Sequence, residues 1–253
     1  KKNTPILTYH SLGELSDNPL ISGKIHNISQ NLFFEHLNFF KKNYVIVSVD
    51  EILHQIKNGK SINGSCAITF DDGYLSNLDQ AIPVLDNLQV PATFFIVPGV
   101  VESGRFWRDN VRFLINENLV SKFLKYANKY HSHFKNVTER KFYSDTKNPN
   151  IISSKIVSNT INKFLLEKKL NSKIFTKKIY LGKEDLQKFN YDNISFGNHS
   201  YNHFVLSSLS MEGQYEEISK GIYKEKSSSE VRKNDPLFLM KNCVVKDHWS
   251  NEK

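Results

Sequence analysis

Short apolar runs alternate with amphipathic segments in the first part of the chain, and this alternation constrains the fold more than any other feature. The runs at residues 5–10, 44–49, 66–70 and 91–98 have the length and the β-branched and aromatic content of strands. Between them, apolar side chains recur at helical spacing, as in the segment after Ser29, a suitable helix N-cap. Strands that alternate with helices pair in parallel and are buried on both faces. We therefore expect an α/β protein with a parallel sheet.

Further helices and strands are expected from the same pattern. Asp50 is the expected N-cap of a helix over residues 52–56, and a second helix is expected over residues 75–85. After a long interruption, the pattern resumes at residues 184–189 and continues with a strand at residues 193–197. A helix through Tyr215, Ile218 and Ile222 follows, and a last apolar run covers residues 237–245.

The interruption at residues 104–178 differs in character from the rest. It is rich in Lys, Asn and Ser, and its apolar positions fit polar helices, so it is predicted to be a helical insertion. Residues 224–235 are charged and Ser-rich and have little apolar surface to bury. We expect a single domain over residues 1–253, a helical insertion over 104–178 within it, and a weakly packed tail over 224–253.

Composition excludes several classes of protein. With 39% hydrophobic residues in 253, the chain can bury a sizeable core, and no apolar run is long enough to span a bilayer. The net charge of +8 comes from lysines spread along the chain, without the clustered recognition element of a nucleic-acid binder. Cys66 and Cys243 make neither a disulfide framework nor a zinc-finger ligand set. The chain begins at Lys1 and shows no signal peptide, so its compartment is left open.

Two adjacent carboxylates end the third predicted strand. Asp71 and Asp72 lie where chemistry occurs in parallel α/β folds, at the carboxyl end of a strand. Their side chains point apart, so one can hold a cation while the other acts as a base. The alternative is an Asx turn or a helix N-cap, since Gly73 follows directly.

Two histidines follow another predicted strand at a spacing of four. On a helical turn, His199 and His203 would share one face, which suits chelation of one zinc-like ion, although a surface or capping role is the alternative. In a parallel sheet this pair lies at the same rim as Asp72, and two histidines with one aspartate form a catalytic rather than a structural metal set. His131 and His133 lie in the polar insertion and are expected to be solvated.

Two other residues leave a choice of role. Trp107 opens the insertion and can stack on a sugar face, but a Trp at the start of an amphipathic helix is more often part of a core. His10 ends the first strand and is either a satisfied core histidine or part of the same rim as Asp72.

The motifs together resemble those of the polysaccharide deacetylases, the NodB-homology group of carbohydrate esterase family four. The resemblance rests on residues 69–73 (TFDDG) and 199–203 (HSYNH), with support from residues 5–10, 91–95 and 206–210. It implies a distorted (β/α) barrel. It also implies metal-dependent removal of N-acetyl groups, or less often O-acetyl groups, from a polysaccharide or glycan precursor.

The resemblance also assigns roles to individual residues. Asp72, His199 and His203 would be the metal ligands and Asp71 the catalytic base. The metal would be a divalent ion, with zinc favoured over cobalt, nickel and manganese. The chain would be a hydrolase of carbon–nitrogen bonds in linear amides, with a carbohydrate substrate, no nucleic-acid partner and no transmembrane segment, at the cell envelope or secreted.

The sequence also departs from the family pattern. The Arg-x-Pro-x-Gly strand, whose Arg orients the base, and the Leu-x-His motif, which supplies the general acid, are not found after His203. The barrel is therefore expected to be incomplete at its carboxyl end. His10 and His248 are the candidate acids, and the alternative function is a catalytically impaired glycan-binding or scaffold protein.

Overall fold

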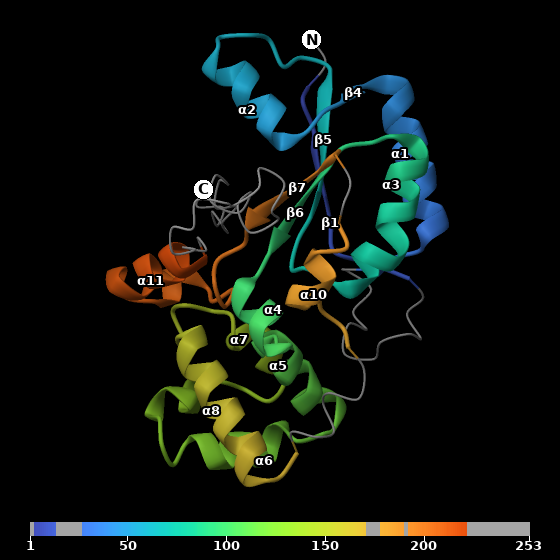
Figure 1. Ribbon diagram of the computed structural model, residues 1–253. Coiled ribbons are helices and arrows are strands. Elements are labelled where there is room, and N and C mark those ends of the chain that lie inside the picture. The colour runs from blue at the N-terminus through green and yellow to red at the C-terminus, as the bar shows by residue number, and fades with distance from the viewer. Residues whose placement is uncertain (1–2, 14–26, 171–177, 190–191, 222–253) are drawn as a thin grey trace.

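The computed structural model describes residues 3–13, 27–170, 178–189 and 192–221. Short strands with helices beside them form one end of this part of the chain, and further helices gather at the other end (Figure 1). In chain order the elements are β1 (Ile6–Tyr9), β2 (Ser11–Leu12), β3 (Asn27–Ile28), α1 (Gln30–Asn43), β4 (Val45–Ile46), α2 (Val49–Lys57), β5 (Ser65–Phe70), the π-helix η2 (Asn77–Ala81), α3 (Ile82–Leu88), β6 (Ala92–Ile96), α4 (Pro98–Ser103), α5 (Trp107–Asn116), α6 (Val120–Ala127), the 3₁₀-helix η3 (Ser132–Asn136), α7 (Phe142–Asp145), α8 (Ser154–Glu167), α10 (Lys183–Leu186), β7 (Ile194–Asn198), the 3₁₀-helix η4 (Leu206–Ser208) and α11 (Met211–Gly221).

The main sheet is parallel, as the alternation of strands and helices predicts. Its strand order is β1–β5–β6–β7, and β4 also pairs with β5. All residues of β5 and β6 are buried, which explains why these strands are continuous apolar runs rather than alternating ones. The predicted α/β class is thus confirmed. Within the described residues the strands form a sheet with β1 and β7 at its two ends, and no strand joins these ends into a barrel.

Helices cover the sheet, and two of their starts test the sequence analysis. Ser29 is the N-cap of α1, as predicted, because its side chain accepts a hydrogen bond from the amide of Leu32. The N-cap of α2 is Ser48 rather than Asp50, whose assignment was wrong. The Ser48 hydroxyl accepts from the amide of Glu51 at 3.0 Å, which places Asp50 inside the first turn, where its negative charge is favourable.

Two other predicted elements differ in extent. The strand expected over residues 44–49 is only the two residues of β4. The helix expected over residues 75–85 begins at Leu75 as predicted, but it contains the π-helical turn η2 and continues through α3 to Leu88.

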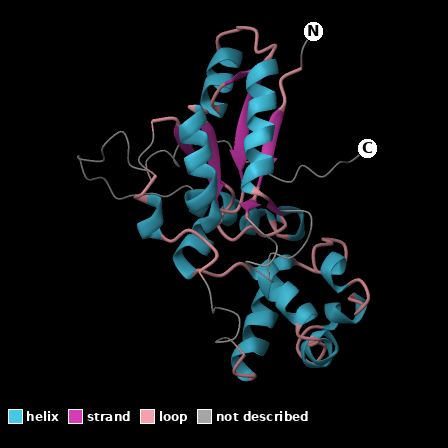
Figure 2. Cartoon of the chain, turned by 90° about the vertical axis from the view of Figure 1, so that its right-hand side faces the viewer, coloured by secondary structure: helices cyan, strands magenta, loops and turns pink. Residues whose placement is uncertain are grey.

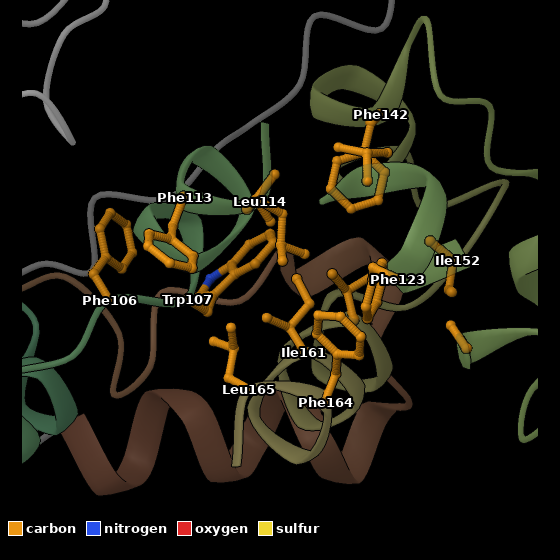
Figure 3. Close-up of a cluster of buried hydrophobic side chains, with 14 of the residues drawn as sticks. Phe106, Trp107, Phe113, Leu114, Phe123, Phe142, Ile152, Ile161, Phe164 and Leu165 are labelled. Atoms are coloured by element: carbon orange, nitrogen blue, oxygen red, sulfur yellow. The ribbon is translucent and has the colours of Figure 1, made fainter. Parts of the chain in front are cut away.

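The segment at residues 104–178 contains helices α5 to α8, which form the lower lobe in Figure 1 and lie away from the strands in Figure 2. Their interior is aromatic, and Figure 3 shows the side chains that meet there. The Phe123 ring packs edge-on against Phe134, Phe142 and Phe164, with ring centroids 5.4, 5.7 and 5.5 Å away. This cluster continues into Tyr74, which follows β5, so the lobe packs directly on the carboxyl edge of the sheet.

Several expectations concern other parts of the chain. The tail at 224–253, the apolar run at 237–245, Cys243 and His248 lie outside the described residues. Cys66 is a buried free thiol. Among the described residues, no helix has both the length and the apolar character to cross a membrane.

We predict that Phe123→Ala destabilises the protein by about 3–5 kcal/mol, because it removes a fully buried ring from contact with three others. Leu166→Ala on α8 is the control, since that side chain is 66% exposed and its loss should cost less than about 0.5 kcal/mol. Urea unfolding followed by circular dichroism measures both changes. Equal unfolding midpoints for the two variants would contradict this account of the core.

Candidate metal centre

The candidate site forms where β5 and β7 end. Asp71 and Asp72 follow the last residue of β5, and the amide of Asp71 donates to the carbonyl of Tyr9 at 2.9 Å. His199 follows β7, and its amide donates to the carbonyl of Ile96 at 2.9 Å. Because β5, β6 and β7 are parallel, these strand ends lie at one edge of the sheet, as expected from the sequence.

Three side-chain atoms converge at this edge. The Nε2 atoms of His199 and His203 are 3.1 Å apart, and Oδ1 of Asp72 lies 3.6 Å from the first and 3.4 Å from the second. All three side chains are largely shielded from solvent, and Oδ1 of Asp72 is buried without a hydrogen-bond partner among the described residues. A carboxylate oxygen and two imidazole nitrogens aimed at one point are a ligand set that suits a divalent metal.

The electrostatics of Asp72 point to the same need for a cation. Burial raises the pKa of this carboxyl, the negative charges of Asp71 and Asp109 raise it further, and it reaches about 8 in the absence of metal. Arg112 and the hydrogen bond from Tyr74 oppose this shift only in part. A bound cation reverses the balance because it favours the ionised carboxylate.

The loop that carries both histidines is held in an uncommon conformation. Ser200 and His203 have φ of 58° and 57°, in the left-handed region that non-glycine residues rarely adopt. The carboxylate of Glu217, on α11, accepts hydrogen bonds from the backbone amide and the side-chain amide of Asn202 at 2.8 and 2.7 Å. In addition, the backbone amide of Tyr201 donates to the carbonyl of Glu217 at 3.0 Å. Glu217, in the second half of α11, therefore fixes the middle of this loop.

The insertion holds the other end of the loop. The indole N–H of Trp107 donates to the carbonyl of His203 at 3.0 Å, and the ring of Phe106 packs edge-on against the His203 imidazole. At Gly99, the backbone amide donates to the carbonyl of Tyr201 at 2.8 Å, and a Cβ atom at this position would lie only 2.7 Å from that oxygen. The loop thus needs glycine at the start of α4.

A buried polar chain links the insertion with Asp72. The hydroxyl of Tyr180 donates to Oδ2 of Asp109 at 2.5 Å, and Nη1 of Arg112 donates to Oδ1 of the same carboxylate at 2.8 Å. The ring of Tyr180 packs on that of Tyr74 with centroids 5.0 Å apart, and the Tyr74 hydroxyl donates to Asp72. Through these contacts, α5 places a positive charge near the acidic end of β5.

Of the other positions considered in the sequence, one lies beside the converging group and the others do not belong to it. Asp71 is buried beside Asp72. His131 and His133 are exposed, as predicted. His10 is half-buried at the end of β1 and does not belong to the converging group.

Sequence reasoning missed Glu217, Gly99 and the Tyr180–Asp109 pair. Each acts through a contact between segments far apart in the chain, which leaves no spacing signal in the sequence. For Trp107 the core alternative holds, because only 5% of its surface is exposed.

Comparison with known proteins agrees with the resemblance. One relative is YxkH of Bacillus subtilis (strain 168), which carries the name of a polysaccharide deacetylase and is 32% identical over 95 residues, or 37% of this chain and 31% of its own length. The structure of the Streptococcus pyogenes deacetylase PplD in complex with acetate is similar with a TM-score of 0.51 and 16% identity, over 86% of this chain and 65% of that one. At that identity the likeness concerns the fold. The chain spans about a third of the first relative and less than two thirds of the second.

The family model described as polysaccharide deacetylase matches residues 58–224, which is more than half of the chain and contains both motifs. The chain belongs to the polysaccharide deacetylase family.

Proposed function

We propose that this chain is a metal-dependent hydrolase that removes N-acetyl groups, or less readily O-acetyl groups, from a polysaccharide or glycan precursor at the cell envelope or outside the cell. The observation that carries the proposal is the convergence of Oδ1 of Asp72 with Nε2 of His199 and of His203 beside a second buried carboxylate, Asp71. The reaction would be hydrolysis of a linear amide, on a distorted (β/α) barrel of which the parallel sheet is the described part.

The ion that suits this ligand set best is zinc, with cobalt, nickel and manganese as alternatives. When bound, it would supply a Lewis acid that polarises the acetyl carbonyl and makes water a better nucleophile near neutral pH. Asp72, His199 and His203 would hold it, and their positions are fixed by β5 and by the anchored histidine loop.

Asp71 would act as the general base. Its carboxylate lies next to Asp72 in sequence and shares its burial, and its backbone is held by the hydrogen bond to Tyr9. In this role it accepts a proton from the attacking water. The leaving nitrogen then needs a proton, and among the described residues His10 at the end of β1 is the candidate donor.

A glycan-binding protein without catalysis is the second candidate. It is favoured by one observation, which is that His10, the candidate proton donor among the described residues, does not belong to the converging group. Such a protein would retain the metal ligands and bind the same sugars without releasing acetate.

We predict that the purified protein binds one divalent ion and that His203→Ala loses most of the affinity, since the remaining two ligands no longer close the coordination shell. His133→Ala is the matched control, because that histidine is exposed in the insertion. Mass spectrometric metal analysis after dialysis against limiting zinc measures both. The same metal content in His203→Ala and His133→Ala would rule out this ligand set.

Asp71→Asn should lower kcat for acetate release from N-acetylglucosamine oligomers by about 10²- to 10⁴-fold while metal content stays unchanged, because an amide of the same shape does not accept the proton. The exposed Asp50→Asn serves as control. Activity of Asp71→Asn near that of the unmodified chain would show that the base is misassigned. Acetate release by neither protein would favour the glycan-binding alternative.

Metal affinity should rise with pH up to about 8 and then level off. Below its pKa of about 8 the Asp72 carboxyl is protonated in the metal-free protein, so binding releases that proton. Because this pKa lies above the unfolded value, the proton stabilises the metal-free fold at acid pH, and this contribution is lost as the pH rises through about 8. Calorimetric zinc titrations in two buffers of different ionisation enthalpy count the protons released. An affinity independent of pH between about 7 and 8, without proton release, would contradict the assignment.

A further inference from the structure

A polar cavity lies behind the histidine loop, on the side of the insertion. It has a volume of about 360 Å³, opens to solvent and is lined by α4, α5, α8 and the loop itself. This size is at the lower end of the range for small-molecule sites and suits a single compact ring. We call it the α4–α8 pocket, and the residues of its lining that matter here are Glu102, Trp107, Asn110, Ser158, Asn162 and Tyr201.

Two facing amides in this pocket have hydrogen-bonding capacity left over. The side-chain amide of Asn110 donates to that of Asn162 at 2.9 Å, which leaves one carbonyl oxygen and one NH₂ group of the pair without partners among the described residues. Exchanging the oxygen and nitrogen of both amides leaves the same two groups. The hydroxyl of Ser158 is likewise without a partner in the part of the chain described, and both Asn110 and Ser158 are buried.

None of these groups is sealed from solvent, and the Asn162 side chain is exposed, so water can fill the cavity and a polar ligand can displace it. The free groups are an amide carbonyl, an amide NH₂ and a hydroxyl, and none of them carries a charge. A ring that bears hydroxyl groups matches them, because each hydroxyl both donates and accepts. An apolar ligand would leave all three groups unmatched.

The rest of the lining fits a sugar ring as well. The ring of Tyr201 adds aromatic surface, against which the C–H face of a sugar can pack, whereas Trp107 and Phe204 are buried and only border the pocket. The Tyr201 hydroxyl donates to the carboxylate of Glu102 at 2.6 Å, and this bond fixes the orientation of that wall. The pocket therefore combines an aromatic ring with neutral donors and acceptors, and the charged side chains of Glu102 and Arg105 also line it.

The pocket shares a wall with the candidate metal centre. Tyr201 and Asn202 lie between His199 and His203 in the chain, and Trp107 bonds to the carbonyl of His203. We infer that the α4–α8 pocket binds one sugar residue of a glycan, separate from the residue whose acetyl group reacts. That the ligand is a glycan rests on the proposed function, whereas the presence of a neutral hydroxyl-binding site rests on the geometry alone.

The test is direct binding of the N-acetylglucosamine tetramer, measured by the fluorescence of Trp107. The chain has two tryptophans, so Trp249→Phe leaves Trp107 as the single reporter in the pocket. In that background, Asn162→Leu removes the free amide and fills part of the pocket, and its side chain is exposed enough for the fold to tolerate it. Asn159→Leu is the matched control, an exposed Asn on the same helix outside the lining.

We expect Asn162→Leu to raise the Kd of the tetramer at least tenfold and Asn159→Leu to leave it unchanged, with equal melting temperatures for the two variants. Equal Kd values in the two variants, or no binding by the parent protein, would overturn the inference, since the cavity would then hold only water. Acetate release is measured in parallel. Binding that depends on Asn162 without any acetate release contradicts the proposed reaction but not the pocket, and acetate release with the same KM in both variants contradicts the pocket but not the reaction.

Discussion

The parallel pairing of β5, β6 and β7 is the constraint on which the candidate site depends. Phe70 pairs with Phe94, and Ile96 pairs with Asn198, so the chain leaves β5 and β7 at the same edge of the sheet. The acidic pair and the first histidine follow these strands directly. A slip of one residue in either pairing would turn the following side chains to the opposite face and separate Asp72 from His199. The burial of every residue in β5 and β6 protects this register, because both faces of the strands contribute to the core.

The backbone at the site is strained, and contacts with neighbouring residues keep it in the left-handed conformation. Asp72 has a φ of 73°, and Ser200 and His203 are also left-handed, so two of the three converging residues adopt a conformation that costs about 1 kcal/mol or more each. Glu217 offsets this cost by bonding the loop twice through Asn202, and the close approach of Gly99 leaves no room for the loop to relax. Strain of this kind is typical of positions where side-chain direction matters more than local stability.

The sequence predicted the strand ends and what they carry, because strands and helices leave periodic signals and the two motifs are short and local. It predicted the Ser29 cap but not the Ser48 cap, since Ser48 and Asp50 are both good caps and the choice depends on where the preceding strand ends. It did not predict Glu217, Gly99 or the bond between Tyr180 and Asp109. The last pair is 71 positions apart in the chain, and only the folding of the insertion against the sheet brings it together. The sequence did not predict the pocket behind the loop either, since its walls come from segments that share no motif.

The indole bond from Trp107 to His203 joins residues 96 positions apart and makes the insertion part of the histidine loop's support. A lobe with its own aromatic core can open locally while the sheet remains folded. Each such opening would withdraw the indole N–H and the Phe106 ring from the loop together. The alignment of the two imidazoles would then depend on the packing of the lobe as well as on the contacts with Glu217 and Gly99. Substitutions of the phenylalanines that pack around Phe123 would therefore alter the alignment of the imidazoles without any contact with them.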